Sequence, residues 1–218
     1  MASRGVIVLG SRSPRRRELL STLVPTERLR VVPPRSADEP SFEGADTWPK
    51  IEQRLRSIAK AKCGDVLEYI SRPDSAGREE VAAVIAADTV IVVAAPDGRP
   101  IVLGQPPERD DWADVVKRWF REFYIGKRHT AATGLCVEAP GGRRVERIVT
   151  TEVTFRADGE RWLDWYVGTG EPIGKAGGYA LQEAGSVFVE RIDGSPSNIV
   201  GLPLEAVLEI FAEMNIDV

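Results

Sequence analysis

The sequence predicts an α/β protein in which helices pack on a β-sheet. Apolar runs typical of buried strands alternate along the chain with segments whose apolar residues recur at helical spacing. The clearest strand is Val81–Ala95, where nearly every residue is apolar. The clearest helix is Asp110–Tyr124, in which the 3.6-residue period is kept by Trp112, Val115, Val116, Trp119, Phe120 and Phe123.

The same two patterns predict the remaining elements in chain order. Val6–Leu9 and Leu29–Val32 are predicted strands on either side of a helix from about Pro14 to Leu23. A long helix is predicted over Trp48–Ile70, with Pro49 in its first turn, and the polar segment Ser71–Glu80 is predicted to be an exposed loop. The second half is predicted to hold strands near Thr130–Glu138, Arg144–Arg156 and Ser186–Ile192, a short helix around Glu160–Val167 and a final helix over Pro203–Met214.

Composition argues against several classes of protein. A net charge of −4 and a pI of about 5.3 disfavour a general nucleic-acid binder. No apolar run approaches the roughly 20 residues that span a membrane, and the apolar start is interrupted by Gly10 and Arg12, unlike a secretory signal. Cys63 and Cys136 are the only cysteines, which disfavours a disulfide framework or structural zinc and predicts a cytoplasmic location.

A helix N-terminus with three arginines follows the first strand. Ser13 is placed to cap this helix, and Pro14 suits its first position because proline lacks the N–H that would go unpaired there. Such an end carries partial positive charge, yet the chain adds Arg15, Arg16 and Arg17 to it. This conflict predicts a polyphosphate ligand, while a solvated basic helix face is the alternative.

Two charged residues interrupt apolar patterns. Asp88 lies inside the predicted central strand, where an ionised carboxylate is costly unless it meets a cation, hydrogen-bond donors or a metal. Asp88 could therefore be a general base, a magnesium ligand or a structural aspartate that accepts backbone N–H bonds. Lys62 falls between Ile58 and Val66 in the apolar stripe of the long helix, so it either snorkels to solvent or meets a buried carboxylate or phosphate.

Other segments carry weaker signals. The Gly-rich run Gly174–Gln182 could approach a ligand closely or serve as a flexible loop, and Gly194–Asn198 could form a second anion-binding helix N-terminus. Glu39 lies in a proline-flanked loop and is uninformative alone, and His129 is predicted to be structural. The sequence has neither a P-loop lysine motif nor a G-x-S-x-G motif, which excludes a P-loop NTPase and disfavours a hydrolase triad.

Taken together, these segments resemble the Maf family, the septum-formation-associated nucleotide pyrophosphatases. The resemblance spans nearly the whole chain. Its motifs, in order, are S-R-S-P-R-R-R-E-L-L, A-A-D-T-V, L-G-Q-P, G-K-R-H-T-A-A-T-G, T-E-V-T-F, E-P-I-G-K-A-G-G-Y-A-L-Q and G-S-P-S-N-I-V-G-L-P-L. It implies a Maf/ITPase-like fold, with a twisted mixed β-sheet flanked by helices and two lobes around a nucleotide-binding cleft. We expect residues 1–218 to form a single domain whose lobes the sequence cannot separate.

The resemblance also implies an activity. Maf proteins hydrolyse a nucleoside triphosphate between the α and β phosphates with a divalent metal, usually Mg²⁺ or Mn²⁺. In the family, the aspartate that falls on Asp88 is the proton acceptor, and the residues that fall on Arg15, Thr89 and Gln182 are linked to base specificity. This combination is similar to the branch that acts on dTTP and UTP, and the Gln182 amide can both donate to and accept from a uracil or thymine edge.

The remaining expected site residues are Ser11, Arg16, Glu39 and Lys62, which fall on positions that the family uses around phosphate and metal. We expect Asp88 and Glu39 to hold the metal and activate water, and the cations Arg15, Arg16 and Lys62 to hold the triphosphate.

One departure from the family pattern concerns charge. The family usually has lysine in L-G-K-P, where this chain has Gln105, so Arg16, Lys62, Lys175 or the metal must supply that charge. The alternative function is a nucleotide-binding regulator of septum formation or cell division with weakened catalysis. A homodimer is left open, since the five tryptophans could supply an interface.

Overall fold

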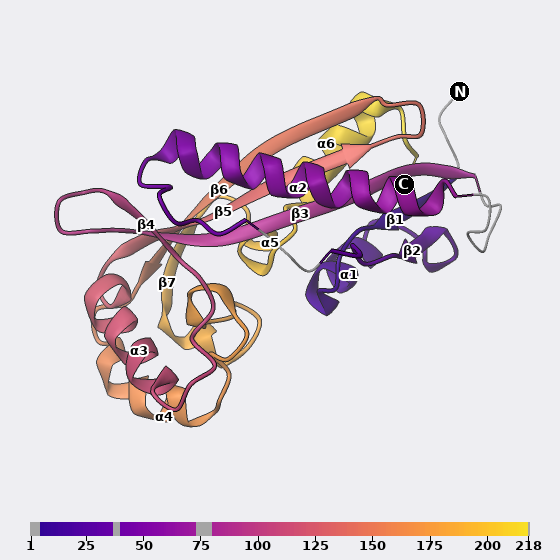
Figure 1. Ribbon diagram of the computed structural model, residues 1–218. Coiled ribbons are helices and arrows are strands. Elements are labelled where there is room, and N and C mark those ends of the chain that lie inside the picture. The colour runs from indigo at the N-terminus through magenta and orange to yellow at the C-terminus, as the bar shows by residue number, and fades with distance from the viewer. Residues whose placement is uncertain (1–4, 37–39, 73–79, 218) are drawn as a thin grey trace.

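The computed structural model describes residues 5–36, 40–72 and 80–217, and within them seven strands form one mixed sheet (Figure 1). The order is β2-β1-β3-β5-β6-β7, with β4 also paired to β3. β1 is parallel to β2 and β3, whereas the other pairs are antiparallel. The strands are β1 (Val6–Leu9), β2 (Leu29–Val31), β3 (Val81–Ala94), β4 (Pro100–Leu103), β5 (Arg128–Glu138), β6 (Arg144–Phe155) and β7 (Val189–Asp193).

The helices flank this sheet and confirm the predicted α/β class. They are α1 (Pro14–Ser21), α2 (Trp48–Ile70), α3 (Trp112–Trp119), α4 (Leu163–Gly168), α5 (Pro196–Val200) and α6 (Leu204–Met214). Short 3₁₀ segments cover Thr26–Arg28, Gly159–Trp162, Ala176–Gly178 and Ala184–Phe188.

The structure differs from the predicted elements at several places. The single helix predicted over Asp110–Tyr124 is α3 followed by a π-helical turn, Phe120–Tyr124. The short elements β4 and α5 were not predicted. The strand predicted over Ser186–Ile192 begins only at Val189, because Ala184–Phe188 form a 3₁₀ segment. Most of the predicted loop Ser71–Glu80 lies outside the described residues, so it stays a prediction.

Two sets of helices cover opposite faces of the first half of β3. Residues that alternate along a strand point to opposite faces, and Val84 and Ala86 pack with α2 while Ala83, Ile85 and Ala87 pack with α1 and α6. Figure 1 shows α2 running along the long strands β3, β5 and β6. Of the apolar stripe predicted in α2, Ile51, Leu55, Ile58 and Val66 are buried, together with Ala59 and Cys63. Tyr69, the last residue of the predicted stripe, is 42% exposed, because it lies in the final turn of the helix.

A second core forms at the other end of β3. Here Ile91 and Val93 pack with aromatic residues from α3, the π-helical turn and α4, including Phe120, Tyr124 and Tyr166. This core and the helices around it are called the smaller lobe below. β3 therefore contributes residues to both cores. Asp88 and Thr89 lie on β3 between the residues of the first core and those of the second.

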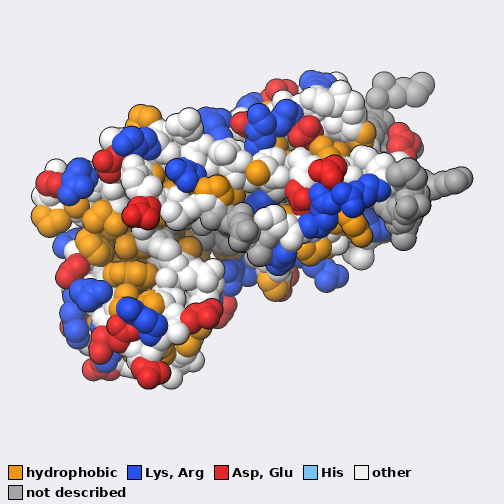
Figure 2. Space-filling model, in the orientation of Figure 1, with side chains coloured by type: hydrophobic (Ala, Val, Ile, Leu, Met, Phe, Trp, Pro, Cys, Tyr) orange, Lys and Arg blue, Asp and Glu red, His pale blue; other side chains and the backbone are white. Residues whose placement is uncertain are grey.

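None of the helices in the described part of the chain combines the length and apolar character needed to cross a bilayer. Over the face shown in Figure 2, basic and acidic side chains are interspersed.

Candidate functional site

The candidate site lies where one edge of β3 loses its neighbour. β1 pairs with β3 as far as Ile85, and β4 pairs with it from Ile91 onward. Between these two points Asp88 and Thr89 border a cavity of about 770 Å³. Because β3 has neither β1 nor β4 beside it here, a ligand in the cavity can contact Asp88 on one face of the strand and Thr89 on the other.

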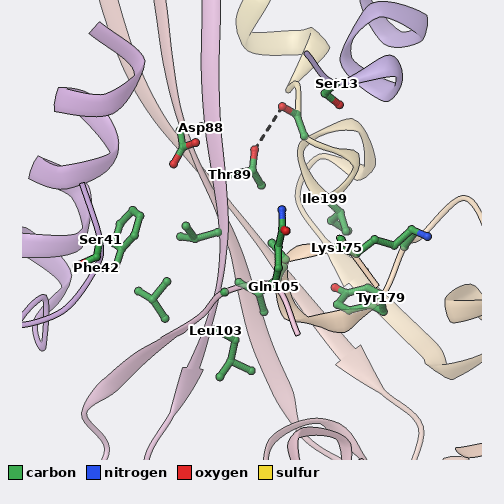
Figure 3. A pocket seen from close by; sticks show the side chains of 18 of the residues that line it. Ser13, Ser41, Phe42, Asp88, Thr89, Leu103, Gln105, Lys175, Tyr179 and Ile199 are labelled. Atoms are coloured by element: carbon green, nitrogen blue, oxygen red, sulfur yellow. Dashed lines mark hydrogen bonds between the residues drawn. The ribbon is translucent and has the colours of Figure 1, made fainter. Parts of the chain in front are cut away.

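Asp88 and Thr89 project to opposite sides of β3 because they are neighbours in a strand. In Figure 3, Asp88 points toward the α2 side with Ser41 and Phe42, and Thr89 points to the other side. Asp88 is 8% exposed, so its carboxylate is largely removed from bulk water.

Lys62 supplies the cation that Asp88 requires. Its Nζ lies 2.8 Å from Asp88 Oδ1, and the two side chains are 13% and 11% exposed. The close approach of α2 depends on Gly134, which pairs with Asp88 across the sheet: a Cβ there would lie 2.5 Å from the Leu55 carbonyl oxygen. Of the alternatives for Lys62, the buried carboxylate partner is confirmed.

The N-terminus of α1 reaches the same cavity. Ser13 caps the helix as predicted, its hydroxyl accepting from the Arg16 amide at 3.4 Å, and Pro14 is the first helical residue. Ser13, Arg15 and Arg16 line the cavity. This wall therefore combines a helix N-terminus with two guanidinium groups, an arrangement that suits phosphate.

Arg16 is held by two groups from other elements. Its Nε donates to the Gly201 carbonyl at 2.8 Å, and its Nη2 donates to Thr89 Oγ1 at 3.2 Å. Arg16 thereby joins α1 to β3 and to the end of α5.

The Gly-rich segment forms the opposite wall. Lys175, Tyr179 and Gln182 line the cavity, as does Gln105 after β4. Figure 3 shows the Gln105 side chain directed into the cavity, near Tyr179 and Ile199. Lys175 Nζ is bound by the Glu171 carbonyl at 2.8 Å and by Glu183 Oε2 at 3.1 Å, so its charge is already partly compensated.

The structure thus brings together the predicted site residues Asp88, Lys62, Arg15, Arg16, Thr89, Lys175 and Gln182. Ser11 is not among the lining residues: it is buried, and its hydroxyl accepts from the Ser13 amide at 3.1 Å. Glu39 lies outside the described residues.

Sequence reasoning missed several lining residues. Phe42, Tyr179 and Ile199 were assigned no role, although Tyr179 lies within the Gly-rich motif. Ser41 and Phe42 precede α2 in a segment with no motif, so nothing in the sequence indicated them. Gly201 carried one signal, the glycine between Val200 and Leu202 at the end of the last motif.

His129 is structural, in agreement with the prediction. It is buried in the smaller lobe, where its Nε2 lies 2.8 Å from the Tyr179 hydroxyl. Burial lowers the pKa of His129 to about 3, so the ring is neutral near neutral pH. The Tyr179 ring in turn lines the cavity.

Glu205 of α6 lies beside Ser195 and Ser197, in the run that the sequence indicates as a second place for an anion. Ser195 caps α5, and the Ser195 and Ser197 hydroxyls donate to Glu205 Oε2 at 2.6 and 3.1 Å. The hydrogen bond from Ser195 lowers the pKa of Glu205 below its usual range. An α6 carboxylate is therefore the anion that these two hydroxyls bind in this structure.

The donor chemistry of the cavity fits magnesium or manganese. Among residues 5–36, 40–72 and 80–217, no group of three or more His, Cys, Asp or Glu side chains forms a metal cage. Mg²⁺, however, is usually held by one or two carboxylates plus substrate phosphates. Asp88 offers one such carboxylate beside cations that suit phosphate.

A sequence profile described as Maf-like protein matches residues 6–214. The chain belongs to the Maf-like family. This Maf-like protein is 38% identical over 201 residues to the dTTP/UTP pyrophosphatase of Anaeromyxobacter dehalogenans, covering 91% of this chain and 88% of that one. It is 39% identical over 199 residues to the dTTP/UTP pyrophosphatase of Paramagnetospirillum magneticum, covering 91% and 92%.

One further relative and one solved structure were also matched. The dTTP/UTP pyrophosphatase of Pyrococcus horikoshii is 33% identical over 205 residues, covering 94% of this Maf-like protein and 95% of the relative. The crystal structure of a nucleoside-triphosphatase (dITP/XTP pyrophosphatase) from Mycobacterium abscessus superposes with a TM-score of 0.42 at 15% identity, over 69% of this chain and 74% of that one.

Proposed function

We propose that this protein hydrolyses dTTP and UTP to the nucleoside monophosphate and pyrophosphate, with a divalent metal ion. Its relatives that carry this activity in their names match over nine-tenths of the chain. The observation that carries the proposal is the Asp88–Lys62 ion pair, 2.8 Å long, on the wall of a cavity of about 770 Å³. A protein that only bound nucleotides would not need this costly carboxylate beside its phosphate-binding cations.

The chemistry follows from the positions of the charged groups. Arg15, Arg16 and the N-terminus of α1 hold the triphosphate. Asp88 accepts a proton from a water molecule, whose oxygen bonds to the α-phosphorus. The bond from that phosphorus to the oxygen bridging the α and β phosphates breaks, and its electron pair leaves with pyrophosphate.

Lys62 keeps the Asp88 carboxylate compensated before the substrate arrives, at 2.8 Å from its Oδ1. Asp88 would also hold the metal ion, with Glu39 as the second predicted ligand. A divalent ion held there would supply positive charge to offset the negative charge of the phosphate oxygens and of the departing pyrophosphate.

The base is expected to face Gln182 of the opposite wall. The Gln182 amide carries a donor and an acceptor and lines the cavity. A uracil or thymine edge also presents both a donor and acceptors, which suits this amide.

The direct test measures pyrophosphate release from all canonical ribo- and deoxyribonucleoside triphosphates with Mg²⁺, with Mn²⁺ and with EDTA. We expect metal-dependent release that favours dTTP and UTP. Asp88→Asn should lower kcat by about 100-fold or more while the protein stays folded, because the amide cannot accept the proton. Asp97→Asn is the matched control, since Asp97 is exposed and paired with Arg99 at 2.6 Å.

Each outcome separates the alternatives. Preference for a purine triphosphate would retain the reaction and overturn the assignment of Gln182 to the base. Binding without release by the folded wild-type protein would favour a nucleotide-binding regulator, with neutral Gln105 as the mark of lost catalysis.

A further inference from the structure

The hydroxyl of Thr89 has hydrogen-bond contacts with three protein groups. It accepts from Arg16 Nη2 at 3.2 Å, lies 2.9 Å from the Thr133 hydroxyl, and donates to the Gly201 carbonyl at 3.3 Å, the last bond being drawn in Figure 3. A hydroxyl has one proton and two lone pairs. Those three partners match this capacity, so the hydroxyl is suited to hold its neighbours in place and poorly suited to read a base edge.

The Gly201 carbonyl is the second group that fixes Arg16. It accepts from Arg16 Nε at 2.8 Å as well as from Thr89. Thr89 and Gly201 thus contact two different nitrogens of one guanidinium. Since a guanidinium is planar, two such contacts fix both its position and the plane in which its other N–H groups lie.

The carbonyl is itself anchored in the sheet through α5. The Gly201 amide closes α5 by donating to the Ser197 and Asn198 carbonyls. Asn198 is fully buried, and its Nδ2 donates to the Ala131 carbonyl at 3.1 Å and to Thr151 Oγ1 at 3.0 Å. The support of Arg16 is therefore connected through α5 to β5 and β6 by hydrogen bonds within the protein.

We propose that Thr89 is a positioning residue, which with the Gly201 carbonyl aims the Arg16 guanidinium at the triphosphate. The inference rests on the proposed function, because it assigns Arg16 to the phosphates. Family resemblance links Thr89 to base specificity, whereas the contacts here assign its effect to Arg16. If so, removing the Thr89 hydroxyl should lower kcat/KM only in a protein that still has Arg16.

A double-mutant cycle tests this dependence. Thr89→Val, Arg16→Lys and the double variant are compared by kcat and KM for dTTP, UTP and dCTP. Lysine keeps the charge of Arg16 but lacks its planar set of donors. With Arg16 present, Thr89→Val should lower kcat/KM about tenfold for every base, in line with one lost hydrogen bond to a charged group. In the Arg16→Lys background, Thr89→Val should lower kcat/KM by less than about twofold.

Two further variants separate positioning from packing. Thr89→Ser retains the hydroxyl and should recover most of the lost kcat/KM. Thr150→Val alters an exposed threonine of β6 and reports the general effect of the substitution. Circular dichroism and melting curves show that each variant is folded, and Thr89→Ala replaces Thr89→Val if that variant is not.

Equal losses of kcat/KM from Thr89→Val in the wild-type and Arg16→Lys backgrounds would overturn the proposal. A Thr89→Val change in the ratio of dTTP to dCTP turnover that is also found in the Arg16→Lys background would overturn it as well. Calorimetry with α,β-methylene dTTP repeats the cycle as Kd, without any chemical step. If the wild-type protein binds this analogue but releases no pyrophosphate, the proposed function fails while coupling in Kd still supports positioning. Absence of both binding and turnover would overturn both.

Discussion

Lys62 on α2 and Asp88 on β3 lie 26 residues apart in the chain and form an ion pair of 2.8 Å at the wall of the cavity. Each residue interrupts an apolar pattern of its own element. Each charged residue is the partner of the other, because the Asp88 carboxylate on the α2 face of β3 contacts the Lys62 ammonium of the α2 apolar stripe. Removing either partner leaves the other charged and largely desolvated.

Lys62→Met should therefore lower both stability and activity. Loss of the ammonium beside the Asp88 carboxylate should cost about 2 kcal/mol in the free energy of unfolding, moderated by the access of the carboxylate to the cavity. Urea denaturation measures this cost. The double variant Lys62→Met/Asp88→Asn should recover most of the stability and none of the pyrophosphate release. A Lys62→Met protein as stable as wild type would show that the pair is not needed to retain the carboxylate.

Gly177 joins the two loops that bear Gln105 and Lys175, and its replacement should affect both stability and substrate binding. Its amide donates to the Gly104 carbonyl at 2.9 Å, and a Cβ at Gly177 would lie 2.6 Å from Ile91 Cγ1. Gly177→Ala should cost more than about 2 kcal/mol by thermal or urea denaturation and should raise KM, since the loops must separate.

Gly174 provides the matched control for this substitution. It has the same φ of +71° as Gly177, but a Cβ there meets nothing within 4 Å. Gly174→Ala should therefore cost only the backbone strain, about 1 kcal/mol. Equal costs for the two variants would assign the effect to backbone conformation alone.

The long elements of the fold were predictable because their patterns repeat many times. α2 and β3 match their predicted positions closely, with 23 and 14 residues respectively. β4 and α5 have only 4 and 5 residues, too few to establish a period. The π-helical turn Phe120–Tyr124 could not be predicted either, because the spacing of its apolar residues also fits a continuous α-helix.

The charged half of the site was predictable for a related reason. Asp88, Lys62 and the arginines of α1 stand out because charge conflicts with their local setting. Tyr179 and Ile199 carry no charge that conflicts with their local setting, so only the tertiary structure shows that they face the cavity. The roles of Thr89 and Gly201 as supports for Arg16 depend on contacts 73 and 185 residues apart, which no local pattern contains.

Gln105→Lys should strengthen substrate binding. Gln105 lines the cavity, and a lysine there would add one positive charge close to a highly charged triphosphate. An added attraction of about 1 kcal/mol corresponds to a KM about fivefold lower at low salt, and salt should weaken the effect. Steady-state kinetics with dTTP at two ionic strengths measures it, and Gln105→Met is the neutral control. An unchanged KM at both salt concentrations would show that the substrate phosphates do not approach Gln105.

His129 should make the protein less stable as the pH falls below its ordinary pKa. Burial holds the pKa of His129 at about 3 in the folded protein, against 6.5 as its ordinary value. The unfolded chain therefore binds a proton first, so the contribution of His129 to stability is complete above pH 6.5 and declines toward pH 3. Between pH 7 and 5.5 the loss should be about 1 kcal/mol, with a limiting slope of about 1.4 kcal/mol per pH unit.

Urea denaturation of wild type and His129→Gln at pH 7, 6.5 and 5.5 isolates this contribution. His129 is the only histidine in the chain, and the carboxyl groups common to both proteins titrate mainly below this window. The difference in unfolding free energy between the two proteins should therefore shrink as the pH falls. A constant difference across the three pH values would mean that His129 can accept a proton in the folded protein, and that the smaller lobe opens enough to hydrate it.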